Sequence, residues 1–201
     1  MKLLIATNNA HKTAEIRAIL GGHFDEIFSL KEAGLDIDVV EDGDTFEANA
    51  LKKAVEALRA AEGIADAALS DDSGLMVDTL GGAPGVHSAR YAGEGHDDGA
   101  NNRKLLEAMR DVPDGARGCR FVSAVALARK GREPIVRRGT AEGVLLRANA
   151  GENGFGYDPL FYYPPLDKSF AQMDAAEKNA LSHRYRALSA LREALEAERN
   201  S

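Results

Sequence analysis

The sequence has little cysteine, no long apolar run and no excess of positive charge. Its single cysteine, Cys119, excludes an intramolecular disulfide and a zinc cluster of thiolates. No apolar run reaches the length of a membrane span and the N-terminus does not read as a signal peptide, so we expect a cytoplasmic protein. Acidic residues outnumber basic residues by 32 to 25, and this balance argues against a nucleic-acid polymer as the main partner.

Several common catalytic motifs are also missing. The chain contains no phosphate-binding G-x-x-x-x-G-K-[ST], no H-E-x-x-H, no G-x-S-x-G and no C-x-x-C. The Asp-Asp-Ser pattern at residues 71–73 also differs from the D-x-D of aspartyl-phosphate phosphatases. Any chemistry must therefore come from other groups of residues.

The pattern that remains predicts one mixed α/β domain over residues 1–201. Apolar periodicity predicts helices at 14–20, from a capping pair Asp44 and Glu47, from Asp98, and from Asp174 to the end. It predicts strands at 2–6, 26–30, 37–40, 67–70, 121–128 and 135–146, the last two joined as a hairpin. Strands alternate with helices first and pair as hairpins later, which favours two lobes with a cleft between them.

The segment Thr7-Asn8-Asn9-Ala10-His11-Lys12 lies between a predicted strand end and a helix start. Such a junction offers backbone N–H groups and the positive end of a helix dipole, which suit a phosphate. Lys12 would add a positive charge. The alternative is a capped turn with a solvated lysine.

Two acidic pairs, Glu41-Asp42 and Asp71-Asp72, are candidate metal ligands. Mg²⁺ prefers one or two carboxylates together with water and phosphate oxygens, and neighbouring carboxylates raise one another's pKa toward that of a usable base. The alternative is that these residues are solvated or cap helices. For Asp71 and Asp72 that alternative is weaker, because we expect them to end a buried strand.

Two further segments could contact a ligand. In Gly154-Phe155-Gly156-Tyr157-Asp158-Pro159 the glycines flank an aromatic ring that could stack on a base. The alternative is a strand edge with core aromatics. Lys178, His183 and Arg184 do not share one face of a straight helix, so either they serve different purposes or the helix breaks at Ser182. We expect the break, with Ser182 as the N-cap of the last helix. The alternative for His183 and Arg184 is a solvated helix face.

Together these segments resemble the inosine/xanthosine triphosphate pyrophosphatase family. The resemblance rests on ATNNAHK, TFEANALKKA, SDDSGLMVDTLGGAPGVHSARYAG, GFGYDPLF and EKNALSHRYRAL, in that order over nearly the whole chain. Bacterial members often have Thr-Gly-Asn where this chain has Thr7-Asn8-Asn9.

The resemblance implies an elongated two-lobed fold around a central twisted mixed sheet, with a long substrate cleft, and a homodimer. It implies hydrolysis of non-standard purine nucleotides (ITP, dITP, XTP) to the monophosphate and pyrophosphate with Mg²⁺. Glu41 and Asp72 would bind the metal, and Asp72 would accept the proton of the attacking water. The implied substrate-binding residues are Thr7, Asn8, Asn9, Ala10, His11, Lys12, Lys53 and Ser73 on the phosphate side, and Phe155, Gly156, Tyr157, Asp158, Lys178, His183 and Arg184 on the nucleoside side.

Two other hypotheses remain open. A non-catalytic nucleotide-sensing module could use the same pocket, although Glu41 and Asp72 argue against it. A related septum-inhibitor-type nucleotide pyrophosphatase would prefer modified or pyrimidine nucleotides, although the Ser-His-Arg and GFGYDP segments argue against that.

Overall fold

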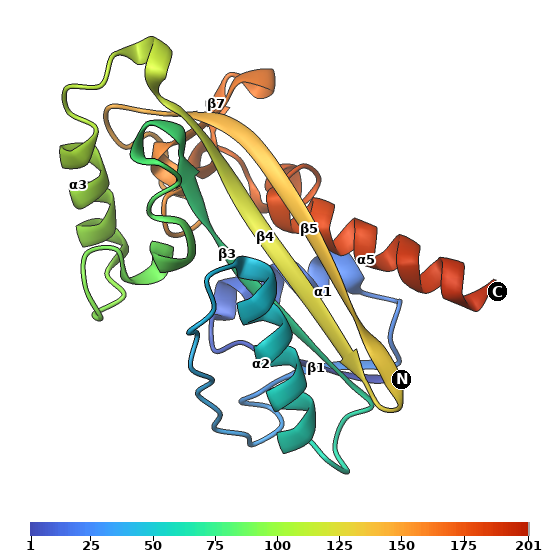
Figure 1. The fold of residues 1–201 in the computed structure, drawn as a ribbon. Coiled ribbons are helices and arrows are strands. Elements are labelled where there is room, and N and C mark those ends of the chain that lie inside the picture. Colours follow the sequence, from blue (N-terminus) through green and yellow to red (C-terminus); the bar gives the residue numbers. More distant parts are fainter. Residues whose placement is uncertain (201) are drawn as a thin grey trace. The chain divides into compact units, whose positions relative to one another are not determined.

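The computed structural model describes residues 1–200 (Figure 1). Its strands are β1 (Lys2–Ile5), β2 (Glu26–Ser29), β3 (Ala67–Val77), β4 (Gly118–Arg129), β5 (Arg132–Leu145), β6 (Phe161–Tyr163) and β7 (Lys168–Ser169). Its α-helices are α1 (Ala10–Leu20), α2 (Phe46–Ala60), α3 (Asp98–Ala108), α4 (Ala175–Asn179) and α5 (His183–Arg199). The predicted mixed α/β class is confirmed.

The strands form one mixed sheet in the order β2-β1-β3-β4-β5-β6-β7. Strand β1 pairs in parallel with β2 and β3, whereas β6 pairs antiparallel with β5 and β7. The chain divides into two compact units, the first made of residues 1–72, 123–139 and those from 183 onward, the second of residues 73–122 and 140–182. Strands β3, β4 and β5 contribute residues to both units.

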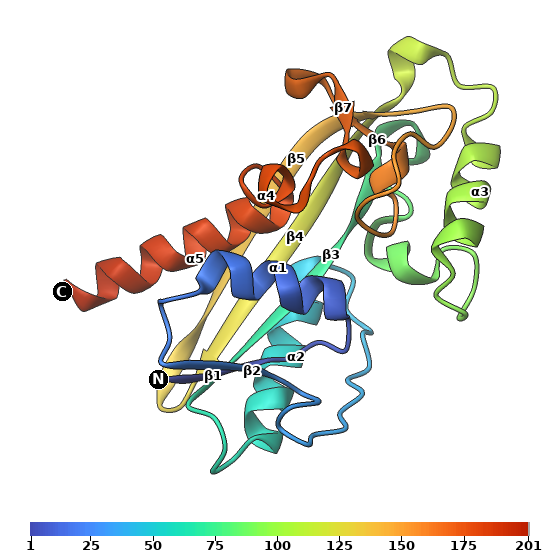
Figure 2. The ribbon, with the colours of Figure 1, turned by 180° about the vertical axis from the view of Figure 1, so that it is seen from behind.

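In the first unit, α2 covers one face of the sheet while α1 and α5 cover the other (Figures 1 and 2). Side chains along a strand alternate between faces, and β1 follows this rule. Leu3 and Ile5 pack in the cluster that includes residues of α1 and α5, whereas Leu4 packs with Ala57 of α2. Each face of the sheet is therefore buried, which explains the continuous apolar run of β1.

The core of the second unit is aromatic. The rings of Phe121, Phe161 and Phe170 have centroids 4.5 to 5.7 Å apart, and all three side chains are buried. The ring of Tyr163 packs on that of Phe170, with the two ring centroids 5.8 Å apart. Aromatic pairs at these separations stabilise a core beyond the area they bury.

Some expected boundaries are wrong. Residues 37–40 form no strand, because the sheet ends at β2 and the segment reaches the core through Ile37 while Val40 is 68% exposed. Strand β3 does not end at Asp71 but continues to Val77. The helix caps shift by one residue, to Thr45 for α2 and Asp97 for α3, because those side chains accept the N–H groups at the helix starts.

Other expectations are confirmed. The C-terminal helical segment is broken, with α4 ending at Asn179 and α5 beginning at His183, directly after Ser182. Strands β4 and β5 are neighbours joined by a two-residue turn at Lys130 and Gly131. Within residues 1–200, none of the helices combines the length and the apolar character that crossing a membrane requires.

Candidate functional site

Asp71 is the centre of a buried group of charges in the first unit. It lies in β3 on the face covered by α1 and α5, and it is 1% exposed. Lys12 Nζ lies 2.7 Å from Asp71 Oδ1, and the Ser123 hydroxyl donates to Oδ2 at 2.7 Å. Arg184 donates from Nε at 3.0 Å and from Nη2 at 3.3 Å. Four donors therefore occupy the two carboxylate oxygens, which together offer about four acceptor positions.

Arg184 links Asp71 to α1. The side chain of Arg184 is completely buried, and its Nη1 also pairs with Glu15. Burial alone would raise the pKa of Asp71, but the Arg184 and Lys12 cations hold that pKa well below its ordinary value. Asp71 therefore stays ionised and suits the holding of cations rather than the acceptance of a proton.

Asp72, the next residue, has different surroundings. It faces α2, and among the described residues its carboxylate accepts a hydrogen bond from Asn49 Nδ2 at 3.0 Å. Burial raises the pKa of Asp72; the cations of Lys53 and Lys12 oppose the rise, and the charge of Glu41 adds to it. A buried carboxylate with a raised pKa suits a general base or a metal ligand.

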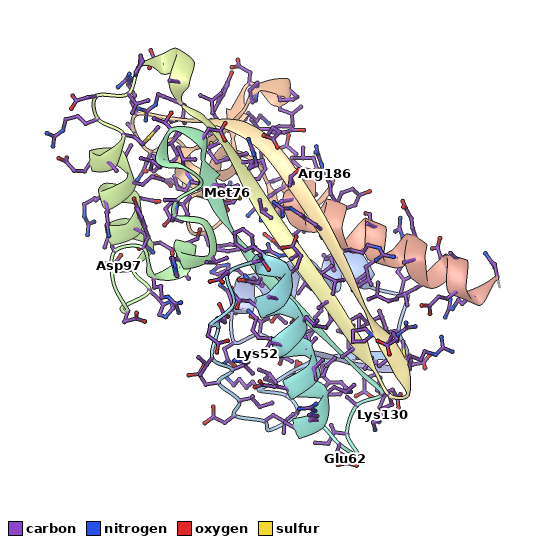
Figure 3. The ribbon with its side chains drawn as sticks, viewed as in Figure 1. Lys52, Glu62, Met76, Asp97, Lys130 and Arg186 are labelled. Atoms are coloured by element: carbon purple, nitrogen blue, oxygen red, sulfur yellow. The ribbon has the colours of Figure 1, made fainter. Side chains whose placement is uncertain are left out.

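Lys53 lies on α2 next to both acidic groups. Its Nζ is 2.6 Å from Glu41 Oε1 and donates to the backbone carbonyl of Asp71 at 3.2 Å. The neighbouring Lys52, labelled in Figure 3, instead pairs with the exposed Asp42 at 2.8 Å. The helix thus directs one lysine to the buried charges and the other to the surface. We call Lys12, Glu15, Glu41, Lys53, Asp71, Asp72 and Arg184 the charge cluster.

The donor set of the charge cluster fits Mg²⁺. Within residues 1–200, no three His, Cys, Asp or Glu side chains form a metal site by themselves. Two carboxylates, Glu41 and Asp72, lie close enough for one to raise the pKa of the other. That number of carboxylates is what Mg²⁺ takes when water and phosphate supply its other ligands.

The predicted phosphate segment surrounds the start of α1. Asn9 is the N-cap, because its Oδ1 accepts from the Lys12 N–H at 3.1 Å, and the Thr7 hydroxyl accepts from the Asn9 N–H at 3.2 Å. Asn8, Ala10 and His11 are exposed. Lys12 is not solvated, since its side chain is 14% exposed and pairs with Asp71. The alternative interpretation is therefore confirmed for the capped turn and wrong for the solvated lysine.

The second unit gathers the predicted aromatic segment, Gly154–Asp158, which we call the aromatic loop. Lys178 Nζ lies 4.6 Å from the ring centroid of Phe155 and 2.5 Å from Asp158 Oδ2. Asp158 Oδ2 also accepts the Phe155 N–H at 2.9 Å. Gly154 has φ +76°, and a Cβ there would collide with the Asp158 carboxylate, so only glycine fits.

The predicted site residues therefore fall into two groups, one in each unit. The charge cluster brings Lys12, Glu41, Lys53 and Asp72 together in the first unit, and the aromatic loop meets Lys178 in the second. Arg184, predicted on the nucleoside side, belongs to the charge cluster. His183 is buried at the first position of α5, whose backbone packs so closely on β5 that a Cβ at Gly139 would strike the His183 carbonyl. Ser73 follows Asp72 in β3 and is half-buried.

Sequence reasoning missed three residues of the first unit. Asn49, which is 2% exposed, holds Asp72 and also accepts the Gly43 N–H at 2.8 Å. Its spacing of four residues from Lys53 was a usable signal, because such a pair shares one helix face. Glu15 and Ser123 carried no comparable signal, since their role appears only when β3, β4, α1 and α5 come together.

Comparison with known proteins agrees with the resemblance drawn from the motifs. Residues 3–194 match the model of the Ham1 family. A dITP/XTP pyrophosphatase of Clostridium perfringens is 49% identical, over 96% of this chain and 97% of that protein. The Ham1 protein of Staphylococcus aureus superposes with a TM-score of 0.85 at 39% identity, over 98% of this chain and 100% of that chain. A HAM1 protein of Coxiella burnetii gives a TM-score of 0.86 at 36% identity, over 98% and 99%.

Proposed function

We propose that this chain, which belongs to the Ham1 family, hydrolyses non-standard purine nucleoside triphosphates such as dITP and XTP. Water attacks the α-phosphorus, the bond to the β-phosphate breaks, and the products are the nucleoside monophosphate and pyrophosphate. The name of the Clostridium perfringens relative supports the substrate class. The observation that carries the proposal is the difference in hydrogen bonding between two consecutive aspartates of β3. Asp71 is saturated with donors, whereas Asp72 is available for chemistry.

The phosphate chemistry falls to the charge cluster. Hydrolysis of a polyphosphate needs neutralised charge, an oriented water and a stabilised leaving group. Lys12 and Lys53 bring positive charge, and the start of α1 adds backbone N–H donors for phosphate oxygens. Mg²⁺, held by Glu41 and Asp72, would supply further charge neutralisation when bound.

Asp72 is the proposed proton acceptor. Its raised pKa keeps the carboxylate basic enough to take the proton of the attacking water, and the amide of Asn49 fixes one of its oxygens. Asp71 cannot take this role without releasing the cations it holds. Ser73, beside Asp72 in the strand, is proposed to contact the substrate.

The aromatic loop is proposed to bind the nucleoside. Phe155 offers a π-face for a purine, and Lys178 and Asp158 hold the loop around it. The backbone N–H groups of His183 and Arg184, at the start of α5, are proposed to donate to the 6-oxo group, where a 6-amino group would oppose donor with donor. The Arg184 side chain is buried against Asp71 and Glu15, so we assign it no contact with the base. A site built to hydrogen-bond a group rejects analogues that lack it by factors of ~10⁴.

The decisive experiment is product analysis with dITP and Mg²⁺, using phosphorus NMR and anion-exchange chromatography. The proposal expects dIMP and pyrophosphate, and much slower hydrolysis of dATP and dGTP. Stepwise release of orthophosphate, or equal rates on dATP, contradicts it. Binding without turnover would favour a sensing module, and preference for a pyrimidine triphosphate would favour the related pyrophosphatase.

The assembly and location of the protein are also proposals. From the resemblance we propose a homodimer in the cytoplasm, with a small-molecule substrate as the partner. Analytical ultracentrifugation of the purified chain tests the dimer, and a monomer at micromolar concentration would contradict it.

A further inference from the structure

Helix α3 holds both backbone polar groups of one residue in the aromatic loop. The Gly156 N–H donates to Asp98 Oδ2 at 2.7 Å, and Asn102 Nδ2 donates to the Gly156 carbonyl at 3.1 Å. Asp98 and Asn102 are four residues apart and therefore share one face of the helix. Two side chains of α3 thus fix the peptide planes on either side of Gly156.

These contacts restrain the backbone dihedral angles of Phe155. The N–H of Phe155 is held by Asp158 Oδ2 at 2.9 Å, and the following N–H is held by Asp98. With both flanking peptide planes bonded, the backbone dihedrals of Phe155 are set, and with them the direction of its Cβ. The cation of Lys178, 4.6 Å from the ring centroid, then contacts the ring that this Cβ carries.

The helix is itself anchored beside this contact. Asn101 accepts the Ala92 N–H at 2.6 Å and donates to the Ala89 carbonyl at 3.1 Å, and it is 2% exposed. The preceding helix cap, Asp97, is labelled in Figure 3. Consecutive asparagines thus connect α3 to two different segments of the second unit. Because Asn101 anchors the helix, α3 can act as a rigid support for the aromatic loop.

Asn102 also has a feature that packing alone does not explain. It is 6% exposed, and within residues 1–200 its buried Oδ1 has no hydrogen-bond partner. A buried unpaired amide oxygen destabilises a fold, so the position is not optimised for stability alone. Its Nδ2 contact with Gly156 gives a reason for the residue to be present.

We propose that Asp98 and Asn102 are positioning residues for nucleoside binding: they orient the Phe155 ring that stacks on the base. The inference rests on the proposed function and deepens it by assigning part of the base-binding energy to α3. Neither residue needs to touch the substrate. Their loss should weaken recognition of the base and leave binding of the triphosphate intact.

The test compares Asp98→Ala, Asp98→Asn and Asn102→Ala with the control Glu107→Ala, which removes an exposed carboxylate from the same helix. Asp98→Ala should raise the KM for dITP about tenfold and leave kcat within about twofold, as expected for lost ground-state stacking. Asp98→Asn retains an acceptor oxygen and should restore most of the affinity. Inhibition by tripolyphosphate, which has no base, should be unchanged in every variant.

Three outcomes overturn the inference: an unchanged KM in both alanine variants, an equal loss of tripolyphosphate inhibition, or the same effect from Glu107→Ala. If the wild-type protein does not hydrolyse dITP, the proposed function fails and a second measurement decides the inference separately. The chain has no tryptophan, so Phe155→Trp introduces a single indole into the aromatic loop. Adding Asp98→Ala should make acrylamide quench this indole more strongly, and unchanged quenching contradicts the inference.

Discussion

Asp71 and Asp72 are consecutive residues of β3 whose carboxylates face opposite sides of the sheet. Asp71 follows Leu69 toward α1 and α5, where Lys12 and Arg184 surround it. Asp72 points toward α2, where Asn49 donates to it. The alternation of side chains along a strand therefore separates a carboxylate that holds cations from one that can do chemistry.

The first prediction concerns Asp72. Asp72→Asn should lower kcat by about 10³-fold, the typical contribution of a general base, because an amide cannot accept the proton of water. The free energy of unfolding should not fall, since burial and Glu41 already disfavour the charged form of Asp72. Steady-state kinetics with dITP and urea unfolding measure the two quantities. Near-normal turnover would move the base to another residue.

Asp71→Asn, in contrast, should lower the free energy of unfolding. Removing the charge leaves Lys12 and Arg184 buried with less compensation, and breaking one partner of a buried ion pair destabilises by about 3–5 kcal/mol. Urea unfolding should show this loss, with Asp72→Asn as the matched control. A variant as stable as wild type would show that the ion pairs contribute little.

Part of this architecture could be predicted from sequence. Apolar periodicity located β1, β2, α1 and the β4–β5 hairpin, because each buries a regular stripe or face. The conflict between Lys178 and Arg184 on a helical wheel located the break before His183. Local patterns were sufficient wherever the physical cause was local.

The charge cluster could not be predicted in this way. Two aspartates in succession look like the end of a strand, yet β3 continues because distant residues compensate them. Lys12 is 59 residues from Asp71 in the chain and Arg184 is 113 residues away. The pairing that buries Arg184 depends on α1 and α5 packing together, which no local pattern contains.

The third prediction concerns the metal. Glu41→Gln should raise the Mg²⁺ concentration for half-maximal activity by about tenfold, because the amide is a poorer ligand for a hard cation. At saturating Mg²⁺ most of kcat should return. Asp42→Asn is the matched control, since it removes the same charge one residue further along, where the side chain is exposed and pairs with Lys52. Equal effects of the two variants would argue for a general charge effect.

The fourth prediction concerns the stability of the second unit. Arg117 is 2% exposed and donates to four backbone carbonyls, those of Met109, Val112, Leu145 and Leu146. Arg117→Met should lower the free energy of unfolding by about 2–4 kcal/mol, because buried carbonyls lose charged donors. Arg110→Met is the matched control, because it makes the same substitution at an exposed arginine. It should change the free energy of unfolding by less than about 0.5 kcal/mol. Urea unfolding of both variants makes the comparison, and equal stabilities would contradict the role of Arg117.

The last prediction concerns the single cysteine. Cys119 is 2% exposed in the core of the second unit, and burial raises the pKa of its thiol from 9.0 to about 12. Because the thiolate is the reactive form, native Cys119 at pH 8 should react with a disulfide reagent on the order of 10³-fold more slowly than in guanidinium, where the pKa returns toward its ordinary value. The raised pKa means that the folded protein retains the proton, so this thiol opposes folding as the pH rises above 9 toward 12. Cys119→Ala should show no labelling in either condition, and labelling of the native protein at the unfolded rate would show that the thiol is accessible.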